Sequence, residues 1–132
     1  MMLQLADINV YYGESHILRN VDLSIEEGQM VCLIGRNGVG KTTLLKTIIG
    51  LLKSRTGKVD YDGHVISQKT PDQRARMGIG YVPQGREVIP RLSVKENLLL
   101  GLEAVTDKRK KLEIPEEIFN LFPVLKTMLS RM

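Results

Sequence analysis

Apolar and polar residues alternate along the first part of the chain in the manner of half-buried β-strands. Residues 3–12 place an apolar side chain at nearly every second position, and residues 17–25 repeat this pattern after a turn at 13–15. The apolar run at 30–34 is uninterrupted, which predicts a strand buried on both faces. We therefore expect two half-exposed antiparallel strands followed by one buried strand.

Turn and capping residues divide the rest of the chain into short elements. An Asp-Gly pair at 62–63 predicts a hairpin over 58–66, and residues 79–82 predict a short strand. Thr-Pro at 70–71 and a Ser-x-x-Glu box at 93–96 are typical helix starts. Helices are expected over about 41–50, from 70 to about 78, from 93 onward, from 115 to 123, and over 124–132.

The composition is that of a soluble globular protein of one domain. The chain has 132 residues, 42% of them apolar and 26% charged. Its longest apolar run is far shorter than the roughly 18 residues of a membrane span. The N-terminus has no basic stretch followed by an apolar core, so we expect no secretory signal and a cytoplasmic protein.

Charge and cysteine usage add little to this picture. The net charge is only +4, and the densest basic run covers residues 108–111. Such a run can contact nucleic acid or an anionic membrane, or it can be a solvated linker. The single Cys32 permits no disulfide within the chain, and its place in the apolar run predicts a packed core residue.

Residues 35–43, with the sequence GRNGVGKTT, match the phosphate-binding pattern G-x-x-x-x-G-K-T without a gap. They follow a predicted strand and precede a predicted helix. Gly35, Gly38 and Gly40 lack the Cβ atoms that would prevent the backbone from curling around phosphate oxygens. The ammonium of Lys41 is expected to reach the β- and γ-phosphates, and the Thr42 hydroxyl is expected to bind Mg²⁺. Thr43 is expected near the α-phosphate.

The order of motifs resembles the first part of the ATP-binding subunit of an ABC transporter. Tyr12 precedes the glycine loop, and residues 78–98, GIGYVPQGREVIPRLSVKENL, are most similar to ATPases of importers for urea and branched-chain amino acids. The resemblance spans the whole chain and implies an α/β P-loop NTPase fold. Residues 1–90 would form an antiparallel β subdomain with a partial parallel-sheet core. Residues 91–132 would begin the helical subdomain.

The resemblance also assigns roles to individual residues. Tyr12 corresponds to the aromatic side chain that stacks on adenine, which suits an exposed ring beside a turn. Gln84 corresponds to the glutamine that contacts Mg²⁺ and the attacking water, which makes it catalytic together with Lys41. Arg86 and Glu87 would lie in the region that senses the membrane subunits, or form a solvated loop pair. The expected ATP ligands are Tyr12, Gly35, Asn37, Gly38, Gly40, Lys41, Thr42 and Thr43, and the expected Mg²⁺ ligands are Thr42 and Gln84.

The partners implied by the resemblance are a second ATPase subunit docked head to tail and transmembrane permease subunits, with no nucleic acid. The protein would then lie at the inner face of the plasma membrane. The chain contains no L-S-G-G-Q signature, no apolar strand that ends in Asp-Glu and no switch histidine after them. We therefore expect an N-terminal portion that hydrolyses ATP slowly or not at all. A non-catalytic nucleotide-binding or assembly module remains an alternative, while the low charge disfavours an ABC protein of DNA repair or translation.

Two other patterns have ordinary explanations. Residues 60–63 fit the D-x-x-G of GTPases, but the chain has no N-K-x-D for guanine, and the Asp-Gly hairpin explains the same residues. His16 and His64 have no second metal ligand at a helical spacing. We expect both histidines to be surface or packing residues.

Overall fold

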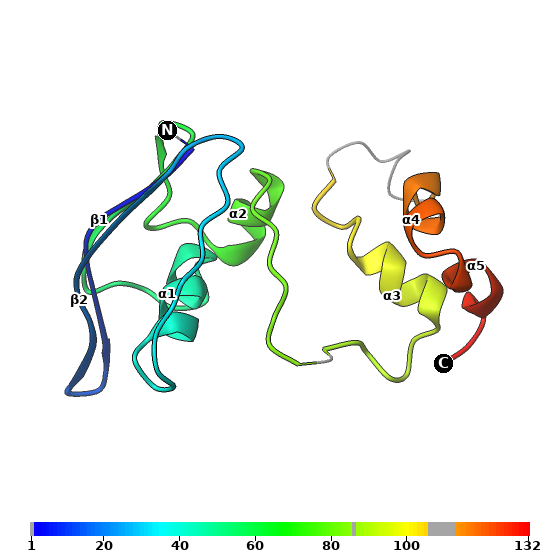
Figure 1. The fold of residues 1–132 in the computed structure, drawn as a ribbon, viewed down its shortest axis with the longest axis horizontal. Helices are drawn as coiled ribbons and strands as arrows, with labels where there is room; N and C mark the ends of the chain where they lie inside the picture. Colours follow the sequence, from blue (N-terminus) through cyan, green and yellow to red (C-terminus); the bar gives the residue numbers. More distant parts are fainter. Residues whose placement is uncertain (1, 86, 106–112) are drawn as a thin grey trace. The chain divides into compact units, whose positions relative to one another are not determined.

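The computed structural model describes residues 2–85, 87–105 and 113–132, which form two compact units that divide between residues 79 and 80 (Figure 1). In the described residues, the first unit holds one β-sheet and two helices, and the second holds three helices. Arg86 and the basic run at 108–111 lie outside the described residues. The division expected near residue 90 stays a prediction.

The sheet of the first unit has four antiparallel strands in the order β2-β1-β3-β4. The central strand β1 pairs with β2 on one side and β3 on the other, so the two alternating strands predicted from the sequence are confirmed. Irregularities in the β1 ladder fall between residues 5 and 11. The strands are β1 (Leu3–Tyr12), β2 (Ser15–Ile25), β3 (Thr56–Tyr61) and β4 (His64–Val65).

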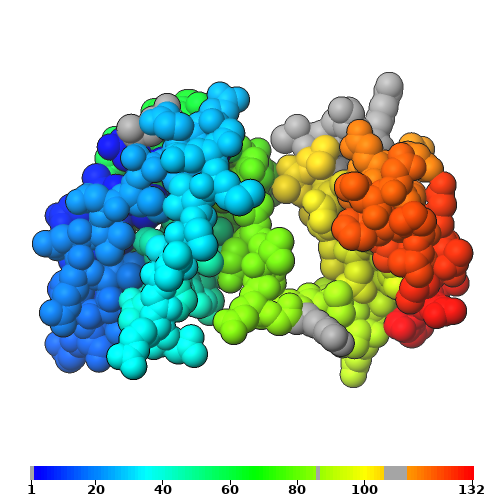
Figure 2. Space-filling view, in the orientation of Figure 1, coloured from blue at the N-terminus to red at the C-terminus, as the bar shows by residue number. Residues whose placement is uncertain are grey.

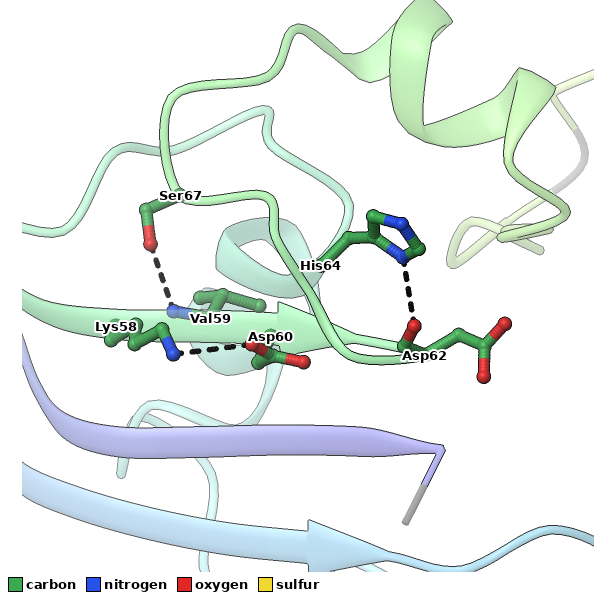
Figure 3. Close-up of polar contacts among 6 residues, drawn as sticks. All are labelled: Lys58, Val59, Asp60, Asp62, His64 and Ser67. Carbon is green, nitrogen blue, oxygen red and sulfur yellow. Dashed lines mark hydrogen bonds and ion pairs between the residues drawn. The ribbon is translucent and has the colours of Figure 1, made fainter.

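A tight turn joins β3 to β4, as the Asp-Gly pair predicts. Asp62 and Gly63 have φ angles of 49° and 75°, the left-handed values of a two-residue hairpin turn. The Nδ1 atom of His64 donates to the carbonyl oxygen of Asp62 at 2.8 Å (Figure 3). Beyond the hairpin, the backbone N–H of Val59 donates to the hydroxyl of Ser67 at 2.9 Å, which ties the chain after β4 to β3.

The core lies between the sheet and helix α1 (Lys41–Ile48). Apolar side chains from alternate positions of β1 meet Leu18 of β2 and Leu44 of α1, and the fully buried ones exclude water from this face of the sheet. The buried apolar residues are Leu3, Leu5, Ile8, Val10, Leu18, Leu44, Val59 and Ile66.

A buried arginine connects α1 to α2 (Pro71–Arg76), whose predicted Thr-Pro start is confirmed. Arg74 is 3% exposed, and its guanidinium donates to the carbonyl oxygens of Thr47 at 2.9 Å and Ile48 at 2.7 Å. It also donates to the carbonyls of Ser67 and Lys69, each at 3.1 Å. These acceptors include the C-terminal carbonyls of α1, which otherwise lack intrahelical donors. Arg74 therefore fixes one end of the helix that follows the glycine loop.

The predicted strands at 30–34 and 79–82 do not form, so this part of the sequence-based assignment was wrong. Met30 and Ile34 are 96% and 88% exposed, and Cys32 is exposed rather than packed in the core. Figure 2 shows this part of the chain (light blue to cyan) on the outside of the first unit. Strand structure requires a neighbour that supplies backbone hydrogen bonds. Within the described residues neither segment has one, so the expected parallel part of the sheet is absent there.

The second unit consists of α3 (Val94–Leu100), α4 (Glu116–Leu121) and α5 (Val124–Met128). The predicted capping box is confirmed, because Ser93 N–H donates to Glu96 Oε2 at 2.8 Å. The N–H groups of Val94 and Lys95 donate to carbonyls of residues 131 and 129, at 2.8 and 3.0 Å. Helix α5 ends at Met128, so the helix expected over 124–132 is shorter than predicted.

Candidate functional site

The loop at 35–40 has two positions whose backbone favours glycine, and a third where a Cβ atom would crowd a neighbouring side chain. Gly38 and Gly40 have φ angles of 82° and 102°, in the left-handed region. A Cβ atom on Gly40 would lie 2.7 Å from Cδ2 of Leu18, and one on Gly35 would lie 2.8 Å from Cγ2 of Val39. The curled loop predicted from the sequence is therefore present, and a loop of this kind can offer backbone amides to an anion.

Helix α1 begins directly after this loop and has the features of an anion-binding terminus. Gly40 is its N-cap, no side chain caps it, and no acidic residue lies in its first turn. The N–H of Leu44 donates to the carbonyl of Gly40 at 2.8 Å, which leaves the earlier N–H groups without intrahelical acceptors. Those groups and the helix dipole favour a negative charge at the loop.

Lys41 and Thr42 are the side chains that this geometry places at the loop. The Lys41 ammonium donates to the carbonyl of Gly35, and to that of Arg36 at 2.7 Å, so it folds back over the curl. Thr42 is exposed at the helix start, where its hydroxyl is free to meet a ligand. Thr43 is 7% exposed, and its carbonyl accepts a bond from the Thr47 hydroxyl at 2.8 Å. Thr43 is therefore largely buried in the first turn of α1, and its expected place near the α-phosphate stays a prediction.

Tyr12 and Gln84 lie in different units. Tyr12 is the last residue of β1, pairs with Ser15 across the hairpin and is 49% exposed, which leaves its ring accessible to a planar ligand. Gln84 is exposed in irregular chain of the second unit. The structure brings the glycine loop, Lys41 and Thr42 together, while the role of Gln84 stays a prediction.

An apolar cavity of about 180 Å³ adjoins the glycine loop, and the sequence patterns did not reveal it. It lies between β2 and the start of α1, and the exposed segment before the loop forms one wall. Only tertiary contacts bring these apolar side chains together, so no local signal could have identified it. Its lining residues are Leu18, Val21, Leu33, Ile34, Val39, Gly40, Lys41 and Leu44.

Neither alternative pattern forms a site of its own. Asp60 is paired with Lys58 at 3.2 Å on β3 (Figure 3), as expected for a strand residue. His16 stacks on Tyr11, and no group of three or more His, Cys, Asp or Glu residues able to hold a metal occurs among residues 2–85, 87–105 and 113–132. Over the same residues, no helix is long and apolar enough to cross a membrane.

Comparison with known proteins places these features in one family. Residues 18–131 match the family model described as ABC transporter. The chain is 36% identical over 130 residues to a probable branched-chain amino acid transport ATP-binding protein, LivF, of Archaeoglobus fulgidus, covering 98% of this chain and 55% of the relative. It is 37% identical over 125 residues to the high-affinity branched-chain amino acid transport ATP-binding protein BraG of Pseudomonas aeruginosa, covering 95% and 53%.

Solved structures give the same result. A structure of the ATP binding subunit of an ABC transporter superposes with a TM-score of 0.81 at 29% identity, covering 98% of this chain and 53% of that one. A dimeric structure of a bacterial ABC transporter cassette superposes with a TM-score of 0.77 at 27% identity, covering 98% and 60%. The chain spans about half the length of the curated relatives it matches.

Proposed function

Because the chain belongs to the ABC transporter family and matches the N-terminal half of its ATP-binding domain, we propose that it binds ATP through the loop at 35–43. The observation that carries this proposal is the glycine curl closed by Lys41 at the start of α1. A glycine loop with an ammonium beside it, followed by a helix N-terminus, suits the three phosphates of a nucleotide better than a neutral ligand.

Each site residue has a definite task in this proposal. Lys41 exchanges its bonds with the Gly35 and Arg36 carbonyls for bonds to the β- and γ-phosphates, and Tyr12 stacks on the adenine. In this proposal the hydroxyl of Thr42 would hold a magnesium ion, which would neutralise phosphate charge, and Gln84 would supply a second oxygen ligand. The donor set fits, because Mg²⁺ prefers oxygen ligands.

We further propose that the complete cassette hydrolyses ATP to ADP and phosphate to energise solute import, as a peripheral subunit on the cytoplasmic side of permease subunits and beside a second ATPase subunit. The relatives named above favour branched-chain amino acids, and urea rests only on the sequence resemblance. The solute is not bound by this chain, so no residue described here selects it. Lys41 would stabilise the charge that develops during in-line attack on the γ-phosphate.

Calorimetric titration of the chain with Mg-ATP tests the binding proposal. Lys41→Ala should weaken binding about tenfold or more, since it removes charge-assisted hydrogen bonds to phosphate. Lys46→Ala is the matched control, because Lys46 lies in the last turn of the same helix. If the unaltered chain does not bind Mg-ATP, or if the two variants bind equally, the loop is not the nucleotide site.

The same samples measure whether the chain hydrolyses ATP by itself. Binding without turnover is the result expected of this chain, both as a portion of a hydrolysing cassette and as a nucleotide-binding or assembly module. A steady release of phosphate that Lys41→Ala abolishes would show instead that the chain is catalytically competent.

A further inference from the structure

Three side chains stack on the hairpin that carries Tyr12. The rings of Tyr11 and His16 have centroids 4.0 Å apart and planes 10° apart. The guanidinium carbon of Arg55 lies 4.7 Å from the centroid of the Tyr11 ring, a cation–π distance. The stack joins β1, β2 and the residue before β3, and nothing in the proposed function uses it.

A buried asparagine fixes the histidine of this stack. Asn9 is 7% exposed, and its Oδ1 accepts from the backbone N–H of Asn20 at 3.1 Å, while its Nδ2 donates to the carbonyl of Asp7 at 3.0 Å. These two bonds fix the orientation of the Asn9 amide. His16 Nε2 lies 2.8 Å from the acceptor Oδ1, so Nε2 carries the hydrogen that is donated in this bond. The N–H of Arg55 donates to the Asn9 carbonyl at 2.8 Å. The chain segments that contain His16, Asn20 and Arg55 are therefore all hydrogen-bonded to the buried Asn9 of β1.

The opposite face of the same hairpin meets the glycine loop. Successive side chains of β1 point to opposite faces, so Tyr12 lies opposite to Tyr11 and shares a face with Val10, which pairs with Leu18. A Cβ on Gly40 would lie 3.5 Å from Cγ2 and 3.6 Å from the carbonyl oxygen of Ile17. Figure 1 shows the β1–β2 turn and the loop before α1 at the same end of the first unit. Movement of the hairpin end would therefore move Tyr12 relative to the loop.

We infer that the stack of Arg55, Tyr11 and His16 positions Tyr12, holding its ring at the place that a base requires when its phosphates lie in the loop. This inference rests on the proposed function. The stack consists of positioning residues that never touch the ligand. It therefore affects the contribution of the base to affinity and leaves the contribution of the phosphates unchanged.

The test compares two ligands that share the phosphates and differ in the base. Calorimetry with Mg-ATP and with Mg-tripolyphosphate measures the ratio of the two affinities in the full chain. Tyr11→Leu should weaken ATP about fivefold, the effect of losing an aromatic pair, and leave tripolyphosphate within about twofold. Tyr11→Phe keeps the ring and should keep the ratio. Arg55→Gln, at an exposed position, should lower the ratio about two- to threefold.

A double variant separates positioning from a direct or merely structural role. In the Tyr12→Leu background, Tyr11→Leu should leave the ratio unchanged, because no base-binding ring remains to be positioned. If Tyr11→Leu weakens both ligands equally, its role is structural, and the inference is wrong. A further drop of the ratio in the Tyr12→Leu background would mean that Tyr11 itself meets the base, which also overturns it.

Failure of the proposed function would give a different calorimetric result for the unaltered chain. An unaltered chain that binds neither ligand contradicts the loop as a phosphate site. An unaltered chain that binds both ligands equally contradicts only the roles of Tyr12 and of the stack.

Discussion

Replacement of Arg74 by methionine should be among the most destabilising single changes in the first unit. Arg74→Met keeps the length of the side chain but removes four hydrogen bonds to the carbonyls of residues 47, 48, 67 and 69. Burial lowers the pKa of the Arg74 guanidinium, yet arginine stays protonated in proteins, so the native site holds a charge. The substitution therefore acts through lost donors and not through a change of protonation.

The magnitude follows from two opposing effects. Hydrogen bonds from a charged donor contribute about 1.5–3 kcal/mol each, and orphaned buried carbonyls add a desolvation cost. Relief from burying the charge offsets part of this loss, which leaves an expected destabilisation of about 3–5 kcal/mol. Folded domains have only about 5–15 kcal/mol of stability, so much of the variant should be unfolded under mild denaturing conditions. Arg74→Lys keeps the charge but loses the planar fork, and we expect about half the effect.

Urea denaturation followed by circular dichroism measures this effect. Arg76→Met is the matched control, because Arg76 lies on the same helix, 62% exposed, in a 3.7 Å pair with Asp72. An exposed pair contributes at most about 1 kcal/mol, so the control should change the midpoint little. If Arg74→Met and Arg76→Met lower the stability equally, the buried network does not hold α1 as described.

Two further changes test the sheet and the second unit. Gly57→Ala should lower the free energy of unfolding by about 2 kcal/mol or more in urea denaturation, because its Cβ would lie 2.3 Å from the carbonyl oxygen of Asp7 at a φ of 95°. An unchanged free energy of unfolding would contradict the close packing of β3 against β1 at this residue. Hydrogen bonds from the Ser93 hydroxyl and backbone N–H lower the pKa of Glu96 in the folded protein. The stabilisation of α3 by the Glu96 carboxylate is therefore complete above the unfolded pKa, about 4.3, and is lost as the pH falls through the lower folded pKa. An NMR titration of the Ser93 amide should have a midpoint below that value and disappear in Glu96→Gln; a midpoint at or above it would refute the capping bond.

Local sequence signals predicted the features that depend on neighbours along the chain. The Asp-Gly turn, the Thr-Pro and Ser-x-x-Glu helix starts and the glycine curl each occupy only a few residues, and the structure confirms each of them. Their geometry is dictated by φ preferences and short-range hydrogen bonds, which a sequence displays directly.

Features that depend on distant residues were not predictable in the same way. The run at 30–34 has the composition of a buried strand, but composition does not supply the neighbouring strand that would satisfy its backbone. From the sequence, Arg74 is an ordinary charge on a polar helix, and only the fold surrounds it with four carbonyls from two segments. The Tyr11–His16 stack likewise exists only because a hairpin register places residues 11 and 16 opposite each other.

The two carbonyl contacts of the Lys41 ammonium have a consequence for selectivity. A cation that already has oxygen partners does not attract every passing anion, because the incoming group must match the bonds it displaces. Chloride or a single carboxylate offers too few oxygens or charges at the right spacing, whereas a polyphosphate supplies several at once. The loop should therefore bind the small anions of the surrounding salt weakly. A ligand with several negatively charged oxygens can replace the Lys41 contacts that it displaces.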